Sequence, residues 1–287
     1  MISRETILGF LNFLVAKKLE NSASSYISIK NALNIFAIPF PIIRISKGTP
    51  LFRARINENE NILFNTVQDL GHIISRNKIL TFGRANEPLQ SIFYCSTSST
   101  VSRFETSLIH RNNLDKNSEA VTIGKWILNK DIFVACLPSF EKEKHRSKIV
   151  NRLDNEFDLL IKNFTYDGIA DWKMVLKLFS IEFMKKDIIG NYLISSAFSN
   201  YVYNTFGKNP ETGETIEPDG IMYPSVQFEH DGMNIALKPE LVEDRSIELA
   251  LAVYQRLNRF AEKEYRDTVT IKSKTIDYDS YEITWNQ

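Results

Sequence analysis

The residue most able to do chemistry is a glutamate in an otherwise apolar stripe. Glu105 lies in a predicted helix, four residues after Val101 and four before Ile109. Residues at this spacing share one helix face, so the carboxylate is expected to face the core. A buried carboxylate is costly unless a charged or polar group answers it. Two interpretations fit: a structural ion pair, for example with Arg53 or Arg84, or a carboxylate at the floor of a functional pocket.

Two further stretches carry polar side chains in apolar surroundings. Arg53 and Arg55 alternate with apolar residues, so they share one face of a predicted strand. That face is either a solvated edge or the wall of a pocket, where arginine would suit phosphate groups through paired charge-assisted hydrogen bonds. Ser225 follows a proline at the end of a predicted buried strand, and Asn234 lies in the next strand. A serine in that position is commonly part of a turn, so its type alone does not reveal its role.

The order of these stretches is more informative than any one of them. Between about residues 49 and 240 the chain contains, in this order, Leu51-Phe52-Arg53, the turn Gly83-Arg84-Ala85-Asn86, a strand with Tyr94, a helix with Glu105, Tyr223-Pro224-Ser225 and the strand Asn234-Ile235-Ala236-Leu237. In this order and spacing the chain resembles the RES family, which is named for an arginine, a glutamate and a serine.

The resemblance implies both a fold and a function. The fold would be α+β and ADP-ribosyltransferase-like, with a mixed or antiparallel β core flanked by helices. Many family members are toxins of bacterial toxin–antitoxin pairs. They cleave the bond between nicotinamide and ribose in NAD and pass the ADP-ribose to water or inorganic phosphate. NAD would then be the substrate, with no cofactor or metal, and the partner protein would be a helix-turn-helix antitoxin that covers the active site.

The resemblance also implies roles for individual residues. Cleavage of an N-glycosidic bond develops positive charge on the ribose, which a fixed carboxylate at Glu105 would stabilise. Arg53 and Arg84 suit the diphosphate of NAD. Tyr94 would stack on the nicotinamide or ribose, and Ser225 would hydrogen-bond the nicotinamide amide or a ribose hydroxyl. The expected catalytic residues are Arg53, Glu105 and Ser225, and the expected NAD-binding residues are Arg84, Asn86, Tyr94 and Asn234.

The sequence departs from the family pattern directly after the Gly-Arg-x-Asn turn. Residues 87–90 are Glu-Pro-Leu-Gln, where the family usually has Pro and then Gly. This departure keeps open a non-enzymatic binding protein on a degenerate version of the fold. A second alternative to an NAD-degrading enzyme is a mono-ADP-ribosyltransferase that uses the same pocket to modify a protein. Arg55 competes with Arg53 for the family arginine, and we favour Arg53 because it directly follows the Leu-Phe pair.

Around these residues the pattern predicts mixed helices and strands without a regular βαβ rhythm, which is typical of an α+β fold. We expect a helical N-terminal segment at 1–48 and a RES-like domain at 49–287. Expected helices cover 4–19, 24–36, 98–110, 145–163, 171–187 and 188–206, and residues 207–218 form a loop. Expected strands lie at 42–45, 51–56, 91–97, 120–128, 132–137, 220–226, 233–237, 247–253, 268–274 and 278–285.

Composition limits the classes of function. The 287 residues include 35 Lys and Arg and 35 Asp and Glu, so the net charge is 0 and a strongly basic nucleic-acid binder is not expected. The 43% of hydrophobic residues is ordinary for a globular protein. The sequence has no P-loop, Rossmann glycine motif, nucleophile elbow or Cys/His cluster.

Targeting and redox features point to the cytoplasm. We see no secretory signal and no apolar run long enough to span a membrane. Cys95 and Cys136 lie in separate apolar runs and do not make a disulfide framework. We expect both to be reduced, buried residues of a cytoplasmic protein.

Overall fold

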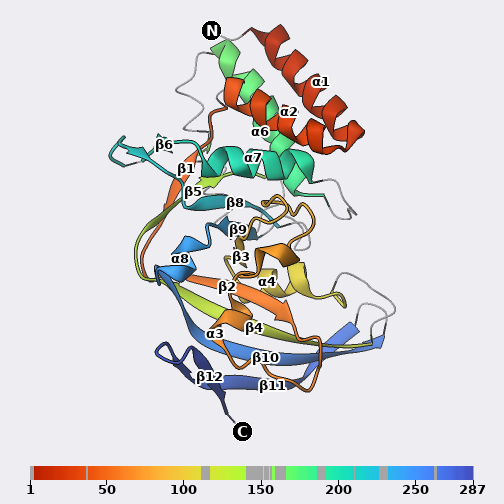
Figure 1. Ribbon diagram of the computed structural model, residues 1–287, viewed down its shortest axis with the longest axis vertical. Coiled ribbons are helices and arrows are strands. Elements are labelled where there is room, and N and C mark those ends of the chain that lie inside the picture. Colours follow the sequence, from red (N-terminus) through yellow and green to blue (C-terminus); the bar gives the residue numbers. More distant parts are fainter. Residues whose placement is uncertain are drawn as a thin grey trace.

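Helices and strands are mixed along the chain, as Figure 1 shows. The computed structural model describes residues 3–36, 38–110, 117–139, 151, 155, 157–158, 166–185, 192–209, 211–225, 232–261 and 264–286. Its helices are α1 (Arg4–Glu20), α2 (Ala23–Phe36), α3 (Val67–Leu70), the 3-10 turn η1 (Arg76–Lys78), α4 (Ser99–Thr106), α6 (Tyr166–Phe183), α7 (Leu193–Tyr203) and α8 (Glu240–Glu243). Its strands are β1 (Ile42–Ile45), β2 (Pro50–Ile56), β3 (Phe93–Ser96), β4 (Ser118–Leu128), β5 (Ile132–Cys136), β6 (Gly207–Lys208), β7 (Thr215–Ile216), β8 (Gly220–Pro224), β9 (Met233–Leu237), β10 (Ile247–Ala261), β11 (Glu264–Asp277) and β12 (Glu282–Trp285).

A large, mostly antiparallel sheet organises the molecule. Ten of the described strands form it, in the order β1-β5-β8-β9-β3-β2-β4-β10-β11-β12. The pair β5–β8 is parallel, and the other neighbours in this sheet run antiparallel. The predicted mixture of helices with a mixed or antiparallel β core is therefore confirmed.

Strands β2 and β3, near the middle of the sheet, are paired with each other much less extensively than with their other neighbours. Strand β2 pairs with β4 over seven residues, and β3 pairs with β9 over four. The register between β2 and β3 themselves consists of the single pair Phe52 and Ser96. We call this junction the seam. Since Arg53 and Cys95, the next residues along the two strands, are not paired with each other, side chains from both strands can enter the space between them.

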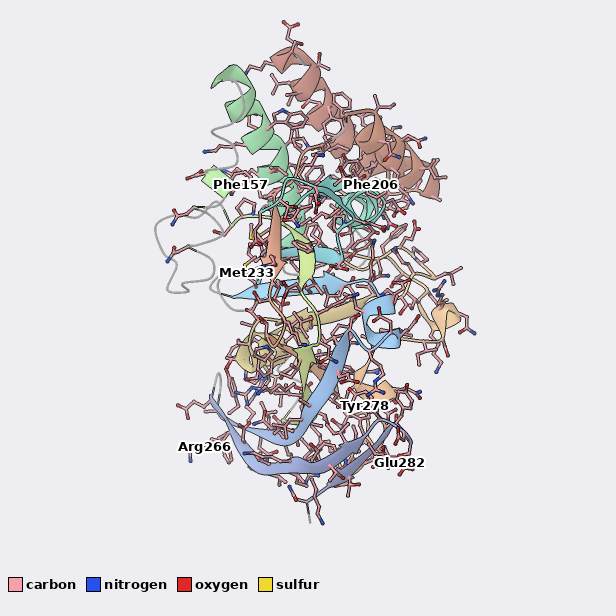
Figure 2. The ribbon with its side chains drawn as sticks, turned by 90° about the vertical axis from the view of Figure 1, so that its left-hand side faces the viewer. Phe157, Phe206, Met233, Arg266, Tyr278 and Glu282 are labelled. Atoms are coloured by element: carbon pink, nitrogen blue, oxygen red, sulfur yellow. The ribbon has the colours of Figure 1, made fainter. Side chains whose placement is uncertain are left out.

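Two apolar cores pack on the sheet, and strands β5, β8 and β9 contribute residues to both. On one side, α1, α2, α6 and α7 contribute buried residues such as Leu14, Leu33 and Phe198, which pack with residues of β8 and β9. On the other, Trp126, Leu249 and their neighbours pack with α3 and α8. Figure 2 shows the two ends of the molecule: Phe157 and Phe206 lie at the helical end, Met233 lies in between, and Arg266, Tyr278 and Glu282 lie at the end with the long strands.

The N-terminal helices form as predicted. The Ser3 hydroxyl oxygen accepts a hydrogen bond from the Thr6 backbone N–H at 3.2 Å and caps α1, which ends at Asn21 in a left-handed conformation (φ 47°). Strand β1 also lies inside the segment 1–48, yet it pairs with β5 in the large sheet. This segment therefore contributes a strand as well as helices, and the division of the chain at residue 48 stays a prediction.

Several element boundaries differ from the prediction. Helix α4 ends at Thr106 rather than near His110 because Ser107 is extended. The predicted loop 207–218 contains the short β6–β7 hairpin. Most of the predicted helix 145–163, and residue 226 of a predicted strand, lie outside the described residues. No described helix is both long enough and apolar enough to cross a membrane.

Candidate functional site

A cavity of about 310 Å³ lies at the seam. Strands β2, β3 and β9, helix α4 and the turn at 83–86 supply most of its wall, so residues far apart in the sequence meet there. Its volume is at the small end of the range for ligand pockets. The residues that line it are Arg53, Ala54, Gly83, Arg84, Asn86, Tyr94, Cys95, Ser96, Ser102, Glu105, Thr106, Tyr192, Tyr223 and Asn234.

Glu105 is at the centre of the polar contacts in this cavity. One carboxylate oxygen accepts from the Ser225 hydroxyl at 2.6 Å and from the Asn234 side-chain amide at 3.0 Å. The other accepts from an Arg84 Nη at 3.2 Å. The carboxylate side chain is only 12% exposed. Donors arranged in this way stabilise the charged form and hold both oxygens in fixed positions.

The helix that carries Glu105 is shorter than predicted, which changes the neighbours of the carboxylate. The Ser98 hydroxyl caps α4 by accepting from the Val101 N–H, and Val101 is buried as expected. Because the helix ends at Thr106, Ile109 does not share a helix face with Glu105. Both earlier interpretations of the carboxylate are present in one geometry: it forms an ion pair with Arg84, and it lines a cavity.

Arg53 and Arg55 separate clearly in the structure. Arg53 lines the cavity, donates to the Tyr94 carbonyl at 2.7 Å and lies over the Phe93 ring. Arg55 instead donates to the backbone carbonyl of Asp69, away from the cavity-lining residues. Burial, and then the neighbouring charge of Arg55, lowers the pKa of Arg53 to about 10, so the guanidinium is still cationic at neutral pH.

The two cavity arginines hold unused donors. Arg84 donates to Glu105 and to the Lys185 carbonyl, and its guanidinium lies 5.8 Å from the centre of the Tyr192 ring. Even so, the Nε groups of Arg53 and Arg84 are buried and bond to nothing among the described residues. Both residues line the cavity, so an anion bound there would meet two guanidinium groups.

The Gly-Arg-x-Asn turn packs against Tyr94. The Tyr94 hydroxyl donates to the Asn86 side-chain oxygen at 2.8 Å and accepts from the Ala85 N–H at 2.9 Å. A Cβ atom on Gly83 would lie 2.2 Å from the same Asn86 oxygen, so the turn requires glycine there. Burial raises the pKa of Tyr94 and keeps the hydroxyl protonated as a donor. Asn86 and Tyr94 therefore shape the cavity together.

Ser225 occupies a different place from the one expected. It is fully buried and is not among the residues that line the cavity. It lies directly after β8, where its N–H donates to the Gly232 carbonyl and its hydroxyl donates to Glu105. In this geometry Ser225 contacts the cavity-lining carboxylate of Glu105 and does not itself line the cavity. Asn234 does line the cavity, and its side-chain oxygen accepts from the Ser96 hydroxyl at 2.7 Å.

Sequence reasoning missed several residues of the wall. Tyr223 was part of the Tyr-Pro-Ser segment but had no expected role, and Ser96 and Ser102 had no signal beyond their polar type. Tyr192 directly precedes α7, inside a stretch predicted simply as helix. Burial raises the pKa of Tyr223 well above its usual value. A protonated phenol there offers the cavity a neutral hydrogen-bonding group.

The cavity has no cluster of metal ligands, since no group of three or more His, Cys, Asp or Glu among the described residues is arranged to hold a metal ion. Cys95 and Cys136 are both buried, as predicted, and neither forms a disulfide. Comparison with known proteins found no matching family model, no similar curated protein and no similar solved structure. The case for a function therefore depends on the residues of the cavity and on the resemblance noted in the sequence.

Proposed function

We propose that this chain cleaves the nicotinamide–ribose bond of NAD, with water or inorganic phosphate as the acceptor, on an ADP-ribosyltransferase-like fold. One observation carries the proposal: Arg53, Arg84 and Glu105, from three separate stretches, line one cavity, and Ser225 contacts Glu105 from behind. The RES resemblance names these four positions, and their convergence supports a shared site.

The chemistry of the residues matches the demands of this reaction. As the C–N bond breaks, its electron pair leaves with the nicotinamide nitrogen, which becomes neutral and needs no strong general acid. The ribose carbon becomes cationic, and the carboxylate of Glu105 would stabilise that charge through space. An oxygen of water or phosphate then attacks the ribose carbon, and one proton is released when water is the acceptor.

The arginines suit the anionic part of the substrate. Arg53 and Arg84 both line the cavity, and a diphosphate presents anionic oxygens to their guanidinium groups. With phosphate as acceptor, one of these guanidinium groups would hold it beside the ribose. A cavity of about 310 Å³ suits the nicotinamide ribose half of NAD better than the whole dinucleotide.

The proposal also concerns the setting of the activity. We propose a toxin of a toxin–antitoxin pair that acts in the cytoplasm and is neutralised by a helix-turn-helix protein. If so, expression of the chain without its partner arrests growth.

The decisive experiment identifies the products made from NAD. Purified protein is incubated with NAD, with and without inorganic phosphate, and the products are identified by mass. Free nicotinamide with ADP-ribose indicates water as the acceptor, and a phosphorylated ADP-ribose indicates phosphate. Tagged NAD in the same reaction reveals any label transferred to protein, which would favour a mono-ADP-ribosyltransferase. Absence of nicotinamide release would contradict the proposal and favour a binding protein.

A further inference from the structure

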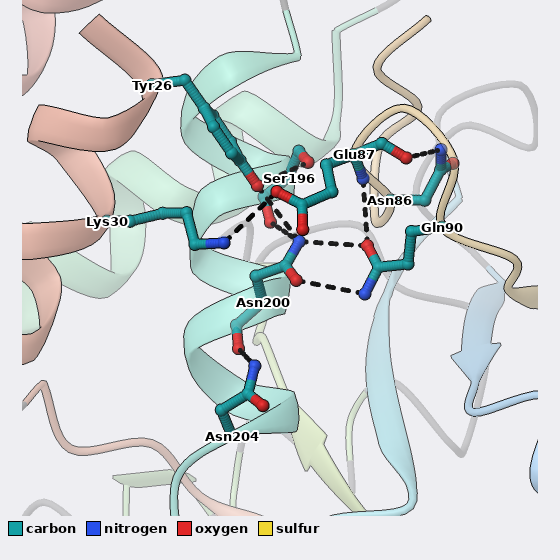
Figure 3. Close-up of polar contacts among 8 residues, drawn as sticks. All are labelled: Tyr26, Lys30, Asn86, Glu87, Gln90, Ser196, Asn200 and Asn204. Carbon is teal, nitrogen blue, oxygen red and sulfur yellow. Dashed lines mark hydrogen bonds and ion pairs between the residues drawn. The ribbon is translucent and has the colours of Figure 1, made fainter. Parts of the chain in front are cut away.

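The turn that carries Arg84 is held by contacts with two helices, α2 and α7. Residues 83–90, which we call the arginine turn, include Arg84 and Asn86 of the cavity wall and the four residues that depart from the family pattern. Figure 3 shows side chains of α2 and α7 that reach this turn. None of these helical side chains lines the cavity.

A pair of side-chain amides, one from buried Asn200 and one from half-buried Gln90, forms the main contact. The side chains of Gln90 and Asn200 exchange two hydrogen bonds, each 3.1 Å long (Figure 3). The Gln90 side-chain oxygen also accepts from the Glu87 N–H at 3.0 Å, so the pair reaches the backbone of the turn. Asn200 is 3% exposed and also donates to the hydroxyl of Tyr26, on α2, at 3.1 Å. One continuous network thus joins α2, α7 and the arginine turn.

Three further contacts reinforce the same link. The Tyr203 hydroxyl, on α7, donates to the carbonyl of Ala85 at 3.2 Å, directly beside Arg84. The Tyr26 ring packs on Phe82 with the ring centres 4.6 Å apart. At the surface, the Lys30 ammonium forms an ion pair with Glu87 at 3.2 Å (Figure 3). Contacts at Phe82, Ala85 and Glu87 therefore hold the chain on both sides of Arg84.

The turn requires such support because its backbone is not relaxed. Leu89 has a φ of 65°, in the left-handed region that a leucine rarely adopts. Its side chain is 57% exposed, so packing of that side chain contributes little to holding the conformation. A strained residue persists where the surrounding contacts determine the backbone. The amide pair one residue later provides contacts of that kind.

We propose that Tyr26, Asn200 and Tyr203 are positioning residues, through which α2 and α7 hold the arginine turn so that Arg84 meets Glu105 in the cavity. The inference rests on the proposed function for its catalytic consequence. It gives the N-terminal helices a role in the site although they lie outside the cavity wall. It also explains residues 87–90, because Glu87 and Gln90 are the side chains by which the turn contacts these helices.

Three tyrosines make a matched test. Tyr26→Phe and Tyr203→Phe each remove one buried hydroxyl that contacts the network or the turn. Tyr201→Phe is the control, because its hydroxyl on the same helix α7 donates to the Ile38 carbonyl and does not contact the turn. All three variants keep their rings and are expected to fold. Two quantities are measured in each: kcat/KM for nicotinamide release from NAD, and hydrogen exchange in peptides that cover residues 83–90.

We expect Tyr26→Phe and Tyr203→Phe to lower kcat/KM about tenfold, since a small misplacement of a substrate-binding group is costly. Exchange across the arginine turn should quicken about fivefold or more. Tyr201→Phe should keep both quantities at the wild-type level. Unchanged exchange in the turn of both test variants, or equal losses of activity in all three variants, would overturn the proposal. A wild-type protein that releases no nicotinamide contradicts the proposed function alone, because exchange in the turn still tests the positioning.

Discussion

At the scale of single residues, Glu105 is where hydrogen bonds from three parts of the chain meet. Its donors are Arg84 from the arginine turn, Ser225 from the end of β8 and Asn234 from β9. Such a carboxylate cannot rotate toward a new partner without breaking several bonds. Its charge is therefore already oriented before any substrate enters, which is the condition for electrostatic catalysis.

The first prediction concerns a variant that lacks the negative charge of Glu105. Glu105→Gln keeps the shape of the side chain but offers no negative charge to the ribose. We expect nicotinamide release to fall roughly 10²- to 10³-fold, the usual effect of losing one oriented electrostatic group. Glu60→Gln is the control, since Glu60 also accepts from a serine hydroxyl (Ser118, 2.6 Å) but is remote from the cavity. Turnover by Glu105→Gln equal to that of the control would exclude the carboxylate from the mechanism.

The second prediction distinguishes two roles of Ser225. The structure has its hydroxyl on Glu105 and not in the cavity wall. We expect Ser225→Ala to lower kcat roughly 10- to 100-fold, as loss of a hydrogen bond to a charged group allows. KM should change less than about twofold, because the serine does not contact the substrate. A large rise in KM with little change in kcat would show instead that Ser225 binds NAD directly.

The third prediction compares the two arginines of β2. Arg53→Ala removes a guanidinium from the cavity wall, whereas Arg55→Ala removes one that donates to the Asp69 carbonyl. We expect Arg53→Ala to raise KM for NAD and also to lower kcat, by about tenfold in kcat/KM or more. Arg55→Ala should leave both constants near wild type. The reverse pattern would identify Arg55 as the substrate-binding arginine.

At the scale of elements, the early end of α4 creates a pH-sensitive contact. The chain turns at Ser107, whose hydroxyl lies 2.8 Å from Nδ1 of His110, and the imidazole packs between the rings of Phe104 and Tyr265. Its Nε2 is buried and bonds to nothing among the described residues. Burial, followed by the charge of Arg103, lowers the pKa of His110 to about 4. The folded protein therefore favours the neutral form of the His110 imidazole.

The fourth prediction follows from that shift. In the unfolded chain His110 takes up a proton near pH 6.5, whereas in the fold it does so only near pH 4. Its contribution to stability is therefore complete above about pH 6.5 and is lost as the pH falls through about 4. We expect the melting temperature of His110→Gln to decline less steeply than that of wild type over this interval. Parallel curves from thermal melts between pH 4 and 7 would contradict the assignment.

The elements that surround the site were largely predictable, because their residues carry clear signals. Ser98 before Val101 is a typical N-cap, and the apolar run around Tyr94 is a typical buried strand. The order of the polar residues along the chain also pointed to Arg53 rather than Arg55. Local sequence patterns could not predict that these residues line one cavity, because such patterns carry no information about distances between separate stretches of the chain.

Other features were not predictable for physical reasons. Helix α4 ends at Thr106, and directly after it Glu119 of β4 accepts from the Ser107 hydroxyl and the Leu108 N–H, contacts that take the place of further helical bonding. Tyr192 enters the cavity wall through the approach of α7, which no spacing in the sequence indicates. The position of Ser225 behind the carboxylate depends on where β8 stops relative to α4. Each of these depends on packing between remote segments.

At the scale of the whole molecule, the N-terminal helices and the sheet share one core. Leu14 of α1 is fully buried in the same cluster as Phe198 of α7 and Ala236 of β9. The fifth prediction is that Leu14→Ala destabilises the protein by about 2–5 kcal/mol, the usual cost of a truncated core leucine. Calorimetry should show a single transition at a lower temperature. Leu19→Ala is the control, because Leu19 is 78% exposed. A separate early transition in the Leu14 variant would mean that the N-terminal helices unfold on their own.

The seam between β2 and β3 has a consequence for how the protein responds to an occupant. Two blocks of strands meet there through Phe52 and Ser96, and the cavity opens between side chains supplied by both blocks. A molecule that contacts both Arg53 on β2 and Asn234 on β9 would connect the two blocks of strands at the place where the backbone pairing between them is sparse. A bound molecule should therefore make the sheet more rigid at the seam. The rise in melting temperature caused by a tight inhibitor would then reflect this added rigidity as well as the affinity of the inhibitor.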